Sequence, residues 1–175
     1  EQESHWFFMR NEISFAAPNF NMHSFEQQFS SLAEEFAMQW KLIDSSRPKK
    51  IVLLVSQHSH CHADILHRWR SGDLAGEVVA VISNHNSLSD IAQWYKVPFH
   101  HIPVTRENKD QANQAIASLL QDYQTDTVVL ARYMQIIPPS LCDAYQGRMI
   151  NIHHSFLPSF VGANPYERAY QRGVK

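Results

Sequence analysis

The sequence is poor in cysteine, in glycine and in long apolar runs, and it carries little net charge. It has two cysteines, five glycines and a formal net charge of −2 over 175 residues. Two cysteines do not make a disulfide framework, and the apolar runs are far shorter than the roughly 20 residues that cross a bilayer. No basic run marks a nucleic-acid surface, and we expect no signal peptide. These absences favour a reduced, cytoplasmic protein with neither a membrane nor a nucleic-acid partner.

The apolar residues fall into short runs separated by stretches with helical spacing. With 44% hydrophobic residues, the chain can bury one full core together with a small extra module. Strands are expected at 51–55, 77–82, 127–131 and 148–153, and helices near 61–70, 88–95, 108–123 and 138–145. A run that is apolar at every position is typical of a strand buried on both faces. The pattern therefore predicts a parallel sheet in βαβ units, which is a Rossmann-like α/β fold.

The first 44 residues follow a different pattern and predict a separate α+β module. Residues 6–15 and 38–43 are expected to be strands, and Ser24 is expected to cap the helix between them with Gln27 as its reciprocal partner. The apolar face of that helix consists of Phe25, Phe29, Leu32, Phe36 and Trp40. The predicted domains are 1–44, a charged and proline-containing linker at 45–50, and the larger α/β domain at 51–175.

Histidine is abundant, and seven of the 11 histidines lie in three clusters. The clusters are His58, His60 and His62, then His100 and His101, and finally His153 and His154. Polar segments follow three of the predicted strands, as SQHSHCH (56–62), SNHNS (83–87) and NIHHS (151–155). Because ligands bind outside the carboxyl ends of parallel strands, these segments are expected to meet at one rim of the sheet and form a site.

Asn151 and His153 are the first candidates for chemistry at this rim. Residues two apart in a strand point to the same face, so these two side chains are expected to project together while His154 projects to the other side. An imidazole can donate or accept a proton, and with an amide donor beside it the pair can stabilise an oxyanion on a tetrahedral intermediate. Two polar residues that satisfy the backbone of a loop would have the same spacing, so both interpretations stay open.

The first histidine cluster permits a different kind of site. An HxH pattern after a strand is found in metal-dependent hydrolases, yet no acidic ligand set accompanies it here, and imidazoles at such a turn also bond backbone groups or line pockets. The same loop contains no glycine, which phosphate-binding loops need for the close approach of their backbone. A nucleotide or dinucleotide cofactor is therefore not expected.

The segment LARYMQIIPPS (130–140) combines aromatic and aliphatic residues in a loop that two prolines close. Tyr133, Met134, Ile136 and Ile137 could line a flat apolar slot with free backbone groups at its rim, which suits a planar heterocycle. Ordinary core beneath a helix would use the same residue types, so this interpretation also stays open.

Taken together, the motifs resemble those of the formyltetrahydrofolate deformylases. The matching segments run in the right order over most of the chain: HWFFMR, VSQHSHC, SNH, VPFHHIPV, VVLARYMQII, NIHHSFLPSFVGANPY and AYQRGVK. The resemblance implies a formyltransferase fold preceded by a partial ACT-like (ferredoxin-like) domain. It also implies hydrolysis of formyltetrahydrofolate to tetrahydrofolate and formate, which supplies formate for purine synthesis and balances the one-carbon folate pools.

The resemblance assigns residues to that reaction. Asn151 and His153 match the family's catalytic pair, with His153 as the acid and base and Asn151 holding the formyl oxygen. A third catalytic residue, an Asp, is expected beyond Lys175, so this 175-residue excerpt alone is expected to be inactive or nearly so. The substrate is expected to contact Tyr133, Met134, Gln135, Ile136, Ile137, His154, Ser155 and Gly162. The resemblance implies no cofactor and no metal.

Further partners follow from the same resemblance. ACT domains carry regulation and assembly, which implies glycine and methionine as effectors and a homo-oligomer. The matching segments begin and end inside recognisable motifs, so the chain is expected to be an excerpt of a longer one. Three alternatives stay open: formyl transfer to an amine acceptor, a zinc hydrolase built on the HSHCH segment, and a non-catalytic folate or amino-acid sensor.

Overall fold

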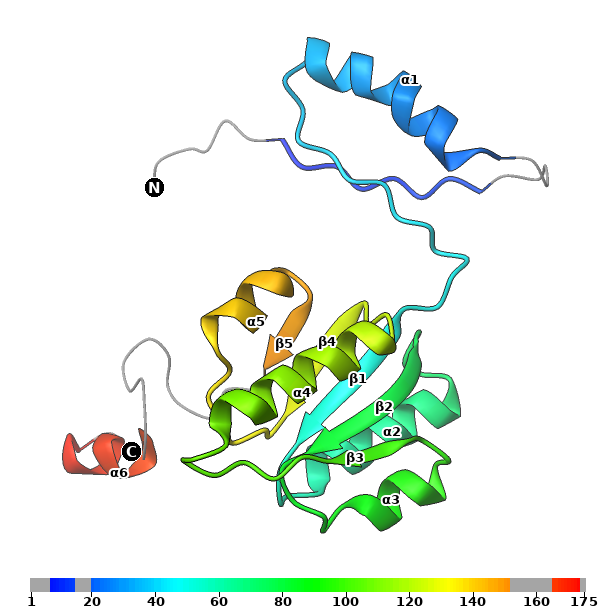
Figure 1. The fold of residues 1–175 in the computed structure, drawn as a ribbon. Coiled ribbons are helices and arrows are strands. Elements are labelled where there is room, and N and C mark those ends of the chain that lie inside the picture. Colours follow the sequence, from blue (N-terminus) through cyan, green and yellow to red (C-terminus); the bar gives the residue numbers. More distant parts are fainter. Residues whose placement is uncertain (1–6, 15–19, 152–164, 174–175) are drawn as a thin grey trace. The chain divides into compact units, whose positions relative to one another are not determined.

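The chain divides into two compact units, Glu1–Ser45 and Ser46–Lys175. The computed structural model describes residues 7–14, 20–151 and 165–173, and Figure 1 shows their helices and strands along the chain. No helix in these described ranges is long and apolar enough to span a membrane.

The first unit contains one helix, α1 (Met22–Glu35), among its described residues. The strands expected within 6–15 and at 38–43 are wrong, because residues 7–14 and 38–43 form no strand in the structure. A strand is held by the backbone of a partner, and an isolated pair of strands is at best marginally stable. The side chains of Phe7 and Phe8 are accordingly 85% exposed.

Helix α1 begins at Met22, earlier than the sequence pattern predicts. Its N-cap is Asn21, whose Oδ1 accepts a hydrogen bond from the backbone N–H of Ser24 at 3.1 Å. Asparagine caps a helix about as well as serine does, so the earlier residue takes the role and the helix gains a turn. The predicted capping box of Ser24 with Gln27 is therefore wrong, since Ser24 lies inside the helix.

The apolar face predicted for α1 packs along part of its length. Phe25 stacks on Phe29 with ring centroids 5.7 Å apart, and Phe29 meets the edge of Trp40 at 4.8 Å. Leu32 and Phe36 remain exposed. The face thus forms a small aromatic cluster that brings the chain beyond the helix back onto it.

The second unit is built on a five-stranded, all-parallel sheet with the order β3-β2-β1-β4-β5. The strands are β1 (Lys50–Val55), β2 (Glu77–Ser83), β3 (Phe99–His101), β4 (Thr127–Ala131) and β5 (Met149–Asn151). The runs predicted as strands at 51–55, 77–82 and 127–131 are therefore confirmed, and the run predicted at 148–153 is a strand at Met149–Asn151, with residues 152 and 153 outside the described residues. The predicted parallel α/β sheet is confirmed with them.

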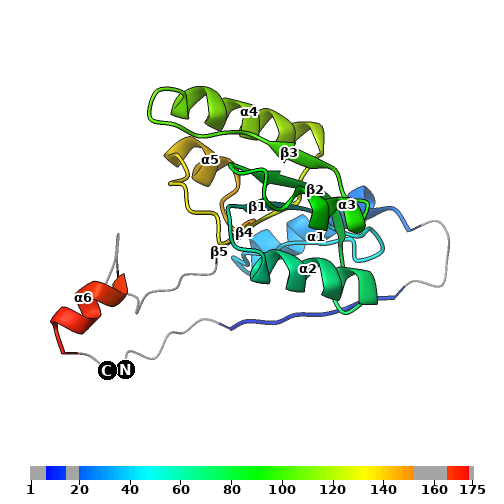
Figure 2. The same cartoon turned by 90° about the horizontal axis from the view of Figure 1, so that it is seen from below.

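Helices cover both faces of this sheet, as Figure 2 shows. They are α2 (His60–Ser71) and α3 (Ser89–Trp94) on one face, and α4 (Lys109–Asp122) and α5 (Pro139–Ala144) on the other. A further helix, α6 (Pro165–Gln171), comes later in the chain. Successive side chains of β1 pack on opposite faces of the sheet. Leu54 lies in one buried cluster with Ile116 of α4, and Leu53 lies in the other with Leu66 of α2. This double burial is why the strands are apolar at every position.

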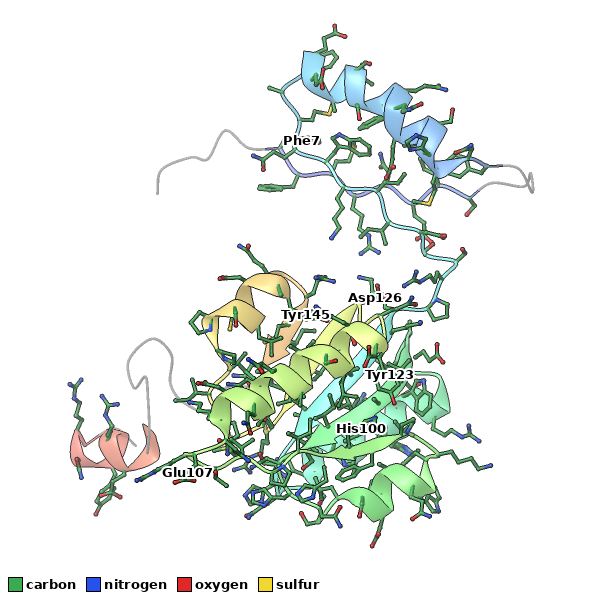
Figure 3. All side chains as sticks on the ribbon, viewed as in Figure 1. Phe7, His100, Glu107, Tyr123, Asp126 and Tyr145 are labelled. Carbon is green, nitrogen blue, oxygen red and sulfur yellow. The ribbon has the colours of Figure 1, made fainter. Side chains whose placement is uncertain are left out.

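The segment that leads into β1 is fixed to the start of β4. Arg47 donates through Nη2 to both carboxylate oxygens of Asp126, at 3.3 and 3.1 Å, and the backbone N–H of Lys50 donates to Oδ2 of Asp126 at 2.9 Å. The hydrogen bond from Lys50, together with the charge of Arg47, keeps the pKa of Asp126 below its usual value. Figure 3 labels Asp126 at this end of the sheet. We call these three residues the entry clamp, since they set where β1 begins beside β4.

Candidate active site

The carboxyl ends of the three central strands are joined through one hydroxyl group. Ser56 directly follows β1 and is 2% exposed. Its Oγ donates to Oδ1 of Asn84, which directly follows β2, at 2.7 Å, and it accepts from the backbone N–H of Met134, beyond β4, at 2.9 Å. A hydroxyl has one proton to give and lone pairs to accept with, so both bonds form at once. The rim expected from the topology has this serine at its centre.

The loop that follows β4 leaves the sheet with a kink. Arg132 has a φ of 57°, in the left-handed region where a non-glycine residue pays about 1 kcal/mol or more. The next side chain, Tyr133, is 8% exposed and belongs to a buried cluster of the core, and this burial raises its pKa to about 12. The N–H of Met134 then meets Ser56. Two successive residues therefore anchor the kinked loop, one by its ring and one by its backbone.

The structure separates the predicted substrate contacts of this loop into two kinds. Met134 and Ile136 expose 54% and 77% of their surface, whereas Gln135 and Ile137 are half-buried and Ile137 packs against the core. Tyr133 is core, as described above. The core interpretation therefore holds for Tyr133 and Ile137, whereas the exposed Met134 and Ile136 leave the ligand interpretation as a prediction.

Asn151 is the last residue of β5. It is in register with Leu130, next to the end of β4, and its side chain is exposed. This register places its amide at the same rim as the loop after β4. The other predicted residues of this segment, His153, His154, Ser155 and Gly162, lie outside the described residues.

The HSHCH segment begins a helix. His58 and His60 are exposed, with ring centroids 6.3 Å apart, whereas His62 is fully buried. Residues two apart on a helix do not face each other, so the helical backbone separates His60 from His62. Within the described ranges, no group of three or more His, Cys, Asp or Glu residues could hold a metal ion. The geometry of the segment therefore gives the zinc interpretation no support.

His62 is a polar side chain inside the core. Its exposed fraction is 0%, and neither ring nitrogen has a hydrogen-bond partner in the part of the chain that the structure describes. Burial lowers the pKa of His62 from 6.5 to about 4. The ring is therefore neutral near pH 7. Grouping His62 with its exposed neighbours, as the sequence pattern did, is wrong, because His62 lies in the core.

A second histidine cluster is also partly structural. Nε2 of His100, on β3, lies 2.8 Å from the hydroxyl of Tyr123 at the end of α4, and Figure 3 labels both residues. The contact ties the edge strand to the helix layer, whereas the side chain of His101 is exposed. We conclude that His100 helps to hold the edge strand β3 against helix α4.

Sequence reasoning did not select Ser56 or Asn84 as site residues. A usable signal was present, because each polar side chain stands directly after or at the end of an apolar run that forms a central strand. The pattern could not predict their contacts, because Ser56 and Asn84 are 28 positions apart in the sequence and Ser56 and Met134 are 78 positions apart.

With this fold and rim described, the chain can be compared with known proteins. Residues 49–175 match the formyl transferase family, and the chain belongs to that family. It is 41% identical to the formyltetrahydrofolate deformylase of Bacillus subtilis (strain 168) over 169 residues, which are 97% of this chain and 56% of that relative. The resemblance inferred from the motifs is thereby confirmed.

Solved structures give the same picture. A crystal structure of a formyltetrahydrofolate deformylase from Pseudomonas syringae pv. tomato is similar at 49% identity and a TM-score of 0.84, over 89% of this chain and 52% of that one. Glycinamide ribonucleotide transformylase 1 from Geobacillus kaustophilus is similar at 28% identity and a TM-score of 0.65, over 73% of this chain and 70% of that one. The chain spans about half the length of the deformylases that it matches, 56% and 52% in the two cases given.

Proposed function

We propose that the protein to which this chain belongs hydrolyses formyltetrahydrofolate to tetrahydrofolate and formate. The observation that carries the proposal is the similarity to deformylases across 97% of the chain at 41% identity. The geometry supports it, because the exposed amide of Asn151 and the kinked loop after β4 lie at the same rim. Formate released in this way supplies purine synthesis and balances the one-carbon folate pools.

The proposed chemistry is the addition of water to a formamide. The water oxygen bonds to the formyl carbon, the C–N bond breaks, and the folate nitrogen leaves with a proton. Asn151 donates an N–H to the formyl oxygen as that oxygen becomes an oxyanion. His153 moves the proton as acid and base, and an Asp beyond Lys175 orients the histidine and the water. The folate lies on residues 133–137, with His154, Ser155 and Gly162 as further contacts.

The first test is formate release from formyltetrahydrofolate by the full-length protein in the presence of EDTA. Turnover that survives the chelator is the expected result, because the proposed reaction uses only side chains and water. Turnover that stops with EDTA and returns with zinc would instead support a metal hydrolase. A complete lack of formate release under both conditions contradicts the proposal.

Formyl transfer to an amine is the second candidate function. The similarity to glycinamide ribonucleotide transformylase 1 favours it at the level of the fold. Against it, the loop between β1 and α2, residues 56–59, has no glycine through which a backbone could approach a phosphate. With water as the acceptor there is no phosphate to hold. Adding a phosphorylated amine acceptor is therefore expected to leave formate as the product, and a formylated amine would overturn hydrolysis.

We also propose that residues 1–44 belong to an ACT-like regulatory domain that takes glycine and methionine as effectors and holds the protein in a homo-oligomer. The aromatic cluster on α1 and the exposed Phe7, Phe8 and Phe36 support an assembly role, because exposed apolar side chains that gather on a surface mark interaction sites. We expect each amino acid to change the rate of formate release by the full-length protein. Identical rates with and without both amino acids would contradict the effector assignment.

A further inference from the structure

The hydroxyl of Ser56 takes no part in the proposed reaction, yet it holds the loop that the reaction depends on. We propose that Ser56 is a positioning residue, which fixes the loop 132–138 in the shape that receives the folate. The identity of the ligand in this inference rests on the proposed function. The contact itself rests on geometry alone, since Ser56 is 2% exposed and its Oγ lies 2.9 Å from the backbone nitrogen of Met134.

The loop needs such an anchor because its first turn is strained. Arg132 adopts a φ of 57°, and a residue with a Cβ relaxes to negative φ when nothing prevents it. The buried ring of Tyr133 fixes one point of the loop. A chain held at one point can still rotate about it, so a second anchor is required to define a direction. The bond from Met134 to Ser56 is that second anchor, and it aims the exposed residues that follow.

Asn84 in turn orients the serine. Its Oδ1 accepts the proton of Ser56 at 2.7 Å, and it is itself buried at the end of β2. With the hydroxyl proton committed to Asn84, the lone pairs of Oγ remain available to the N–H of Met134. Three strand ends therefore meet at one oxygen, and this oxygen fixes the loop relative to the sheet at Met134.

The experiment compares Ser56→Ala with Ser83→Ala in the full-length protein. Ser83 is a matched control, because it is 1% exposed at the end of the neighbouring strand and its Oγ accepts from the backbone N–H of His85 at 3.1 Å. We expect S56A to raise the KM for formyltetrahydrofolate about tenfold, because the loop loses the hydrogen bond between Ser56 and the backbone N–H of Met134. The kcat changes much less, because the loop holds the ground state and the transition state alike. S83A is expected to leave KM near the wild-type value.

Two further variants are expected to give KM values that rank the contributions of the two hydrogen bonds. Ser56→Thr keeps the hydroxyl and is expected to keep KM close to the wild-type value, whereas Asn84→Ala removes only the orienting acceptor and is expected to fall between wild type and S56A. Amide hydrogen exchange is measured on the same proteins without ligand. S56A is expected to speed exchange across residues 132–138, and S83A is not.

Each outcome decides one question. Equal effects of S56A and S83A on KM, or unchanged exchange across 132–138 in S56A, overturn the positioning role. A lower kcat at unchanged KM overturns it too, since Ser56 would then act in the chemical step. If the wild-type protein releases no formate and S56A alone still speeds exchange, the proposed function fails while the positioning of the loop stands.

Discussion

Replacing His62 by leucine is expected to remove most of the fall in the free energy of unfolding that the protein shows as the pH drops from 6.5 to 4. The ring is fully buried and its nitrogens have no partner among the described residues, which is why burial lowers its pKa from 6.5 to about 4. Leucine fills a similar volume and takes up no proton. It also removes two buried polar atoms without partners, so H62L is expected to be the more stable protein near pH 7 as well.

The direction of this change in stability with pH follows from which state, folded or unfolded, binds the proton. The unfolded chain protonates His62 below pH 6.5, while the folded protein does so only below about 4. Between these values the unfolded state binds more protons, so stability is complete above pH 6.5 and falls as the pH decreases. The difference between the two pKa values corresponds to a loss of about 3 kcal/mol once the pH is below both.

The measurement is the free energy of unfolding of wild type and H62L by urea titration across this pH range. His67→Leu is the matched control, because it makes the same change at an exposed position of the same helix. Only H62L is expected to flatten the dependence on pH. If H62L shows the same dependence of the free energy of unfolding on pH as the wild type, folding does not lower the pKa of His62.

Replacing Asn151 by aspartate is expected to lower kcat for formate release about 100- to 1,000-fold, the usual range for the loss of one oxyanion donor. The change keeps the size of the side chain. It exchanges the N–H groups for an oxygen that cannot donate, and it places a negative charge where the proposed mechanism develops an oxyanion. The side chain of Asn151 is exposed at the end of β5, so the melting temperature is expected to stay close to that of the wild type.

The control for Asn151→Asp is Gln146→Glu, which makes the same amide-to-carboxyl change at an exposed site shortly before β5. It is expected to leave kcat unchanged. Steady-state kinetics and thermal melts of the full-length variants decide the matter. Wild-type turnover by N151D would show that Asn151 takes no part in the reaction. A fall in activity that parallels a fall in melting temperature would show the same.

The parts of the fold that follow from local pattern were predictable. Every residue of Ile51–Val55 is apolar because β1 is covered on both faces, and this property is visible in one sequence. The rim also followed, since parallel strands end at a common edge. The expected strands in the first unit failed for the opposite reason, because a strand at 38–43 depends on a distant partner that its own residues do not encode.

The site was less predictable, because its geometry depends on where a helix starts and on contacts across the sheet. The HxH interpretation grouped the histidines by their spacing, and the start of α2 at His60 separated the buried ring of His62 from its exposed neighbours. Tyr133 and Met134 are adjacent in sequence, yet one lies in the core and the other at the rim. The division follows the kink at Arg132, whose positive φ an arginine in the sequence does not predict.

The entry clamp has a consequence for exchanging parts between proteins. Arg47, Lys50 and Asp126 all belong to the second unit, so these contacts that secure the beginning of β1 beside β4 lie within that unit. A foreign sensor grafted ahead of Ser46 therefore leaves the strand register intact, whereas a joint placed after Arg47 discards the charge that holds Asp126. A fusion joint in this protein should therefore lie before Arg47.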